Sequence, residues 1–297
     1  MISGVPTMQF LKELNQEMSD DNIYNGAAAL AYYLTMAIFP ALILLMTLIP
    51  YLPIENVDTA IMDMLGQALP GEAYDMVAGV VNEVTGQKRG GLLSFGILAT
   101  IWATSSGMYA IMQQLNITYD VKEGRNFIRT RLTAILLSLM FAVLVLGAFS
   151  MIVLGGVIQD WLGSQFGFSD WLLWLFAAFR WVMILLALLL GFALVYKFAP
   201  DVEQKFAFIT PGSLLGVLLL IIASLGFAFY TSNFADYSAT YGSIGAIIIL
   251  MLWLYIAGLV ILIGSEINAL VEHHSPEGKR KGEKEEGNRQ GGPLPQK

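Results

Sequence analysis

Residues 171–198 read WLLWLFAAFRWVMILLALLLGFALVYKF, and Arg180 and Lys197 are the only charged side chains in the run. About 20 apolar residues in an α-helix cross the hydrocarbon core of a bilayer, which is roughly 30 Å thick. The run is therefore long enough to span a membrane, and five others resemble it in length and composition. The six predicted spans are Ala27–Tyr51, Leu92–Met112, Ala134–Ile158, Trp171–Phe198, Gly212–Tyr230 and Ser243–Glu266.

The composition of the whole chain agrees with a membrane protein. Hydrophobic residues make up 56% of it and charged residues 13%, whereas soluble proteins average about 25% charged residues. The net charge of −7 disfavours nucleic acid as a partner, because binding to the phosphate backbone depends on clustered Lys and Arg. We therefore expect an all-α, polytopic membrane helical bundle over residues 27–272, with membrane lipids as partners and no nucleic acid.

The distribution of Lys and Arg predicts the orientation of the bundle. Cytoplasmic loops of membrane proteins carry an excess of these residues. With the N-terminus inside, the outer connections hold only Lys88 and Arg89, and the inner segments hold nearly all the others. Both termini are therefore predicted to be cytoplasmic, with residues 1–26 forming a polar N-terminal segment that shows no signal peptide.

Two segments outside the predicted spans, residues 54–88 and 273–297, differ from simple loops in composition. Residues 54–88 carry apolar side chains at helical spacing, interrupted at Pro70-Gly71, and predict a helical hairpin on the outer side; a simple interfacial spacer is the alternative. Residues 273–297 are charged and rich in Gly and Pro, which predicts a disordered cytoplasmic tail.

Several strings of the sequence resemble a known family. They include Asn25-Gly-Ala-Ala-Ala-Leu-Ala-Tyr-Tyr33, Trp102-Ala-Thr-Ser-Ser-Gly107, Tyr196-Lys-Phe-Ala-Pro200, Thr210-Pro-Gly212, Tyr241-Gly-Ser-Ile-Gly-Ala246 and Gly264-Ser-Glu266. In this order and spacing they resemble the BrkB/YihY family of inner-membrane proteins, historically mislabelled as ribonuclease BN. The resemblance covers roughly residues 8–272 and implies a six-helix protein of the bacterial cytoplasmic membrane, for which transport is often suspected.

Arg180 is the most unusual residue within the predicted spans. A cation near the bilayer centre costs about 3 kcal/mol on insertion scales unless it has a partner or reaches the interface. If the fourth span begins at Trp171, Arg180 lies about 13 Å deep, where Asp236 is a candidate partner; if it begins at Trp181, Arg180 lies at the interface. Both readings stay open at this point.

Glu266 ends the sixth predicted span after a run without charge. Such a residue often marks the boundary with water. The alternative is a carboxylate that faces the bundle and responds to protons or cations, assisted by Asn268 or by Asn116.

Other polar residues complete a candidate cavity lined by spans one, two and six. Pro40 interrupts the hydrogen-bond ladder of span one, and the tyrosines before it are candidates to face the cavity. Polar side chains of span two and its exit either bind substrate or hold helices together. The predicted substrate-binding residues are Tyr32, Tyr33, Pro40, Ser106, Asn116, Tyr119, Arg180, Tyr241 and Glu266.

Catalytic and cofactor motifs are missing from the sequence. There is no cysteine, and the only histidines, His273 and His274, adjoin the predicted tail, so no metal site and no cofactor is expected. A zinc-dependent nuclease needs several His and Asp ligands, so an enzyme is not expected, and no P-loop occurs.

The favoured function is a transporter or lipid- and amphipath-handling protein without its own ATPase, with a lipidic or amphipathic substrate. A non-transporting scaffold is the alternative, and a membrane-embedded enzyme acting on lipid is a third; a homo-oligomer is compatible with each.

Overall fold

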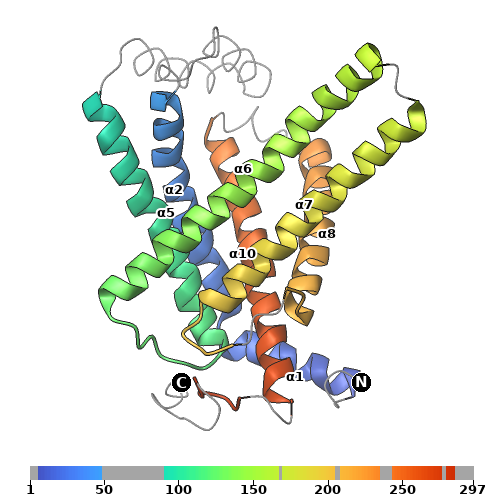
Figure 1. Cartoon of the computed structure of the whole chain (residues 1–297). Helices are drawn as coiled ribbons and strands as arrows, with labels where there is room; N and C mark the ends of the chain where they lie inside the picture. The colour runs from blue at the N-terminus through green and yellow to red at the C-terminus, as the bar shows by residue number, and fades with distance from the viewer. Residues whose placement is uncertain are drawn as a thin grey trace. The chain divides into compact units, whose positions relative to one another are not determined.

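The computed structural model describes residues 6–48, 90–166, 169–204, 208–234, 243–275 and 279–284. Every regular element in these ranges is an α-helix, which confirms the all-α class (Figure 1). The predicted outer hairpin over 54–88 lies outside the described residues, as do Tyr241 and Asp236. The helices are α1 (Thr7–Asp20), α2 (Ile23–Leu48), α5 (Gly90–Thr118), α6 (Phe127–Phe166), α7 (Asp170–Phe198), α8 (Pro211–Phe234) and α10 (Ser243–His273).

Five of the six predicted spans lie within one helix each, from α5 to α10, and the first, Ala27–Tyr51, begins inside α2 and ends beyond its last described residue, Leu48. Four described segments are long and apolar enough to cross a membrane, namely Phe127–Ala148, Trp171–Phe198, Pro211–Ser232 and Ile247–His273. The protein thus has several membrane-spanning candidates. The count of six spans and the cytoplasmic placement of both termini stay predictions.

The helices extend beyond the apolar runs that predicted them. Helix α6 has 40 residues, which at 1.5 Å per residue is about 60 Å, or twice the thickness of the hydrocarbon core. Its predicted span, Ala134–Ile158, covers only the apolar part, because a hydrophobic run ends at the first polar residues whereas helical hydrogen bonding continues through them. The sequence therefore located α6 and underestimated its length.

Helix α1 was not predicted, because residues 7–20 are polar overall. One side of the helix is apolar nonetheless. Phe10 is buried against Ile267 and Leu270 of α10, with Leu14 packed beside it. An amphipathic helix of this kind gains its stability from packing of one face on the protein, so the N-terminal segment is a structured part of the fold.

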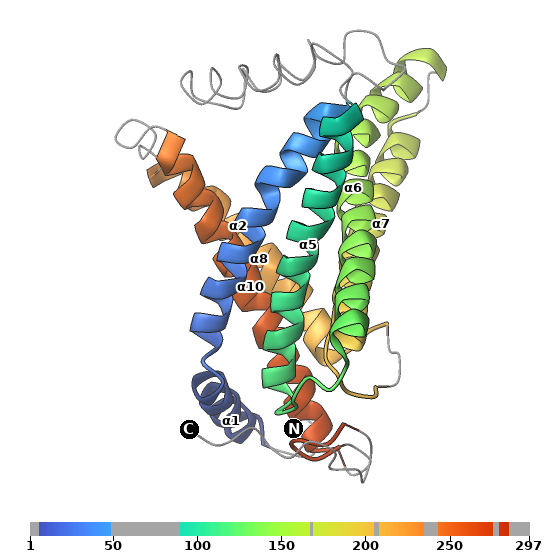
Figure 2. The same cartoon turned by 90° about the vertical axis from the view of Figure 1, so that its left-hand side faces the viewer.

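The chain divides into two compact units. The first comprises Met1–Ile23, Ile111–Ile221 and Val260–Lys297, and the second comprises Tyr24–Ala110 and Ile222–Leu259. Within the first unit, α6 and α7 run antiparallel side by side (Figures 1 and 2). The short connection between them, around residue 169, forces this arrangement.

In the first unit, α8 and α10 cross at two glycines. A Cβ on Gly212 would lie well inside the van der Waals radius of the Gly264 carbonyl oxygen, and a Cβ on Gly264 would collide with the Tyr196 hydroxyl. Tyr196 donates from that hydroxyl to the Ile261 carbonyl at 2.9 Å. Small residues let helix backbones approach closely in membrane proteins, and this crossing is an instance.

In the second unit, α2 packs against α5 and against the first part of α10. Gly107 lies against Leu34, and Gly258 lies against Leu30. The hydroxyl of Thr100 donates to the Pro40 carbonyl at 2.7 Å, so this backbone carbonyl accepts a hydrogen bond from the neighbouring helix α5. Pro40 does not end the helix, because α2 continues to Leu48.

Candidate functional site

Glu266 is the most buried acidic residue among those described, with 1% of its surface exposed. It lies within the membrane-span candidate Ile247–His273. Within the described residues, its Oε1 atom has no N–H or O–H donor, and its carboxyl forms a side-chain hydrogen bond with the carboxyl of Asp21. Two carboxyl groups can share a hydrogen bond only when one of them carries a proton, so a hydrogen bond within this pair requires a proton.

Three further charged residues surround this pair. Glu17 comes from α1, Asp120 follows α5, and Lys281 comes from the C-terminal segment. The ammonium of Lys281 forms an ion pair with Glu17 and lies 4.0 Å from Asp120. We refer to Glu17, Asp21, Asp120, Glu266 and Lys281 as the acidic cluster.

Two tight turns bring Asp21 and Asp120 to the acidic cluster. Asn22, next to Asp21, has a φ of 52°, and Asp120 itself has a φ of 55°. Asn and Asp are the residues other than Gly that adopt this left-handed conformation most readily. The turns let α1 meet α2, and α5 meet the following loop, with an acidic side chain at each corner.

The electrostatics of the acidic cluster favour protonation at mildly acidic pH. Burial raises the pKa of Asp21 to about 6; the hydrogen bond with Glu266 acts in the opposite direction, and the charges of Asp120 and Glu17 add to the rise. Burial likewise raises the pKa of Asp120, against the lowering effect of Lys281. Burial alone would lower the pKa of Lys281, but Glu17 and the neighbouring acids raise it above its usual value. One cation thus faces four carboxyl groups.

Tyr119 and Ser265 connect the acidic cluster to α5. Ser265, the neighbour of Glu266, shares a 2.6 Å hydrogen bond with the buried hydroxyl of Thr118. Tyr119 is buried, and burial together with the charge of Glu272 raises the pKa of its phenol. Tyr119 and Glu266, which the sequence assigned to one cavity, therefore belong to the same region of the first unit.

Asn116 joins two segments of the first unit through its side-chain amide. Its amide donates to Glu123 at 3.0 Å and accepts from the backbone N–H of Asp201 at 2.7 Å. Arg125 pairs with Glu123 at 2.8 Å and donates to the Ala199 carbonyl at 2.8 Å. We call Asn116, Glu123, Arg125 and Asp201 the Arg125 network.

The Arg125 network joins the loop after α5 to the end of α7. Burial alone would raise the pKa of Glu123, but hydrogen bonds from Arg125 outweigh it and hold the pKa below its usual value. Asn268 accepts a hydrogen bond from the backbone N–H of Gly212 at 2.8 Å, and the alternative that Asn116 or Asn268 assists Glu266 stays a prediction. The partner of Glu266 is Asp21. Asp21 lies in the polar N-terminal segment 1–26, for which the sequence predicts no role at the site.

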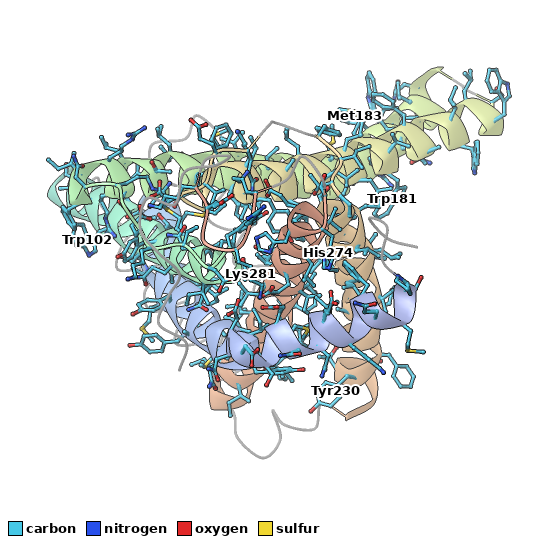
Figure 3. All side chains as sticks on the ribbon, turned by 90° about the horizontal axis from the view of Figure 1, so that it is seen from below. Trp102, Trp181, Met183, Tyr230, His274 and Lys281 are labelled. Atoms are coloured by element: carbon cyan, nitrogen blue, oxygen red, sulfur yellow. The ribbon has the colours of Figure 1, made fainter. Side chains whose placement is uncertain are left out.

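The C-terminal segment 279–284, which the sequence places in a disordered tail, lies against the first unit. Lys279 pairs with Glu272, Lys281 with Glu17 and Lys284 with Asp201. The backbone N–H of Glu203 donates to the Lys284 carbonyl at 2.8 Å. Figure 3 shows Lys281 and His274 close to the end of α10. The lysines of this segment thus meet acidic residues from three other parts of the chain.

The remaining predicted site residues fall in other places. In the second unit, Tyr32 and Tyr33 are exposed on α2 with their rings 5.4 Å apart, and the half-buried Ser106 donates to the Trp102 carbonyl at 2.8 Å. In the first unit, Arg180 lies on α7 and turns toward α6 at Gly155. That these residues line one cavity stays a prediction.

Metal chemistry has little support in the described part of the chain. No group of three or more His, Cys, Asp or Glu side chains there has the geometry to hold a metal ion. What the acidic cluster can do is bind and release protons.

Comparisons with known proteins place the chain among bacterial membrane proteins. A family model described as "Virulence factor BrkB" matches residues 14–289. A protein of Bacillus subtilis (strain 168), named as ribonuclease-like protein YfkH, is 41% identical over 264 residues, covering 89% of this chain and 95% of the relative. No solved structure matches.

More distant relatives carry a membrane-protein name only. A UPF0761 membrane protein of Xanthomonas axonopodis pv. citri is 26% identical, covering 92% of this chain and 64% of the relative. A UPF0761 membrane protein of Photobacterium profundum is 25% identical, covering 89% of this chain and 81% of the relative. This chain therefore spans just under two thirds of the Xanthomonas relative.

Proposed function

Because the chain belongs to the BrkB family of membrane proteins, we propose that it moves lipidic or amphipathic molecules across the bacterial cytoplasmic membrane without an ATPase of its own. The chain has no P-loop, so the energy would come from an ion gradient, from a separate partner or from passive exchange, and we propose the ion gradient. We propose this substrate class because the candidate spans carry few charges, which suits an apolar cargo better than a hydrophilic ion path.

The observation that carries this proposal is the burial of Glu266 against a second carboxyl group, that of Asp21. Ionisable residues within membrane spans are rare, and they often form proton relays in transporters. Glu266 is buried in a membrane-span candidate and its partner lies at the junction of α1 and α2. Loss of the shared proton would set two carboxylates against each other at this junction, which favours a different arrangement of the helices.

This mechanism makes proton binding and conformation mutually dependent. Because the pKa of Asp21 is about 6, the proton occupancy of this carboxyl changes at mildly acidic pH. A ligand or proton shifts a conformational equilibrium only by its difference in affinity for the two states. The buried pair supplies such a difference, because it is stable protonated in the arrangement described here and repulsive when ionised.

The test is transport by the purified protein in liposomes. Fluorescent short-chain phospholipids and an amphipathic dye are followed across the bilayer with and without a pH gradient. We expect wild-type protein to accelerate movement of at least one of them over empty vesicles, and Glu266→Gln and Asp21→Asn to remove the response to the gradient. Asp20→Asn is the matched control, since Asp20 is exposed and adjacent in sequence.

Two results would count against the proposal. If wild-type vesicles behave as empty ones, the chain does not transport these classes, and a scaffold becomes the better reading. If transport occurs but Asp20→Asn and Asp21→Asn affect it equally, the buried pair is not its coupling element.

A further inference from the structure

Arg180 lies in the membrane-span candidate Trp171–Phe198 and directs its side chain toward α6. Its sequence neighbours Phe179, Trp181 and Val182 are apolar and exposed, as expected for side chains that face lipid. Figure 3 shows Trp181 and Met183 on α7. The guanidinium is thus a cation set into an apolar helix surface.

A pair of glycines in α6 makes room for this cation. A Cβ on Gly155 would collide with the Arg180 side chain and lie 3.1 Å from its Nη1, and a Cβ on Gly156 would lie 3.8 Å from the same atom. Any larger residue at position 155 would displace the arginine. We call Gly155, Gly156 and Arg180 the arginine recess.

The guanidinium is incompletely satisfied within the described residues. Its Nε and Nη1 atoms are buried there and have no hydrogen-bond partner. The guanidinium carbon Cζ lies 5.8 Å from the centroid of the ring of the adjacent Trp181. A buried cation without an anion is unfavourable in an apolar environment, so these two nitrogens, unpartnered within the described residues, would be stabilised by a negatively charged ligand.

We propose that the arginine recess binds the phosphate of an anionic phospholipid headgroup. The planar guanidinium presents N–H donors in a fork that matches two phosphate oxygens. The side chain as a whole is only partly buried, so a headgroup can reach it. Exposed aromatic side chains on α7, such as Trp174 and Phe179, provide apolar surface for the acyl chains.

This inference goes beyond the proposed function and shares no residue with the acidic cluster. Binding at the arginine recess needs neither transport nor the Glu266 proton. A Glu266→Gln variant should therefore retain the lipid, and a chain that binds lipid without moving it would contradict the proposed function alone.

The experiment measures lipid retention by native mass spectrometry of the detergent-purified chain, equilibrated with equal amounts of phosphatidylglycerol and phosphatidylcholine. We expect the wild type to retain phosphatidylglycerol preferentially. Arg180→Gln should lower that preference about tenfold, the loss expected for a charge-assisted hydrogen bond. Arg180→Lys should retain part of it, because Lys offers a point charge without the fork.

Gly155→Ala and Gly147→Ala form a matched pair that leaves the arginine in the chain. A Cβ on Gly147 meets nothing within 4 Å, so this variant should bind as the wild type does, whereas Gly155→Ala should lose the preference by displacing Arg180. The pair keeps the test valid if Arg180→Gln fails to fold. Equal retention by wild type, Arg180→Gln and Gly155→Ala would overturn the proposal.

Inorganic phosphate distinguishes the sources of the phosphate group. If excess phosphate leaves the retained phosphatidylglycerol in place, the ligand is the lipid, as proposed. If phosphate displaces the lipid and binds to the wild type but not to Arg180→Gln, the recess is a site for free phosphate and the lipid assignment is wrong.

Discussion

Replacing Gly212 by Ala should destabilise the protein through the crossing of α8 and α10. A Cβ at this position would lie 2.6 Å from Asn268 Cγ, whereas ordinary contacts begin at 3.4 Å, so the two helices must separate by at least 0.8 Å there. They are even closer at the Gly264 carbonyl oxygen, which is backbone and cannot rotate away. The added methyl therefore moves a helix rather than a side chain.

The expected cost follows from two contributions. Overpacking costs about 1–3 kcal/mol, and weakening the 2.8 Å hydrogen bond from the Gly212 N–H to Asn268 costs about 0.5–1.5 kcal/mol. The lower backbone entropy of Ala in the unfolded chain offsets about 0.5–1 kcal/mol of this. The free energy of unfolding should fall by about 1–3 kcal/mol.

Gly226→Ala is the matched control in the same helix. A Cβ there meets nothing within 4 Å, so the variant should be as stable as the wild type or more stable by up to about 1 kcal/mol. Thermal unfolding of the detergent-purified variants, followed by intrinsic fluorescence, compares them directly. If Gly212→Ala unfolds at the same temperature as Gly226→Ala or higher, the helices do not approach at these glycines as described.

Three further predictions concern the polar groups of the first unit. The pKa of Asp21 rises from 3.8 to about 6 on folding, so between pH 3.8 and pH 6 the folded state binds more protons than the unfolded state. The free energy of unfolding therefore falls as the pH rises through this range. Asp21→Asn should unfold at a higher temperature than the wild type at pH 8 and at the same temperature at pH 4. Asn116→Ala should lower the free energy of unfolding by about 1–3 kcal/mol by leaving polar partners of the Arg125 network unsatisfied, measured by chemical denaturation, and an unchanged midpoint would show that the network does not need this amide. Glu17→Gln should speed tryptic cleavage after Lys281, because it removes the ion pair that holds the C-terminal segment, and identical cleavage rates would mean that the segment is held by its other contacts.

The sequence located the helices well and the polar contacts poorly. Apolar runs predicted α7 within one residue at its start and matched its last residue, Phe198, because charged and polar residues flank that run closely. Helix α1 escaped prediction since only Phe10 and a few other residues make its apolar face. The predicted span Ser243–Glu266 is shorter than α10, which continues to His273. The charge of Glu266 predicts the end of the apolar run but does not end the helix.

At the candidate site too, the sequence identified single residues but not the residues they contact. Arg180 and Glu266 were identified from the sequence, because a charge within an apolar run is a local anomaly. The partner of Glu266 was missed, since Asp21 lies in a polar segment and the chain has 23 acidic residues, Glu266 among them, with nothing local to single out one of the others. The signal available was the Asp20-Asp21 pair directly before the first apolar run, at a helix junction.

What the sequence determined by itself is an all-helical membrane protein of the BrkB family with a few charges in its apolar runs. Hydrophobicity along the chain is sufficient for this, because in lipid each backbone group must be hydrogen-bonded within its own segment, which leaves the helix as the local solution. The tertiary structure decided that the carboxyl of Glu266 meets that of Asp21, that Arg180 packs against Gly155, and that the C-terminal lysines pair with acidic residues. These contacts join residues far apart in the chain, so they depend on how closely the helices approach and on turns with positive φ, which no local pattern records.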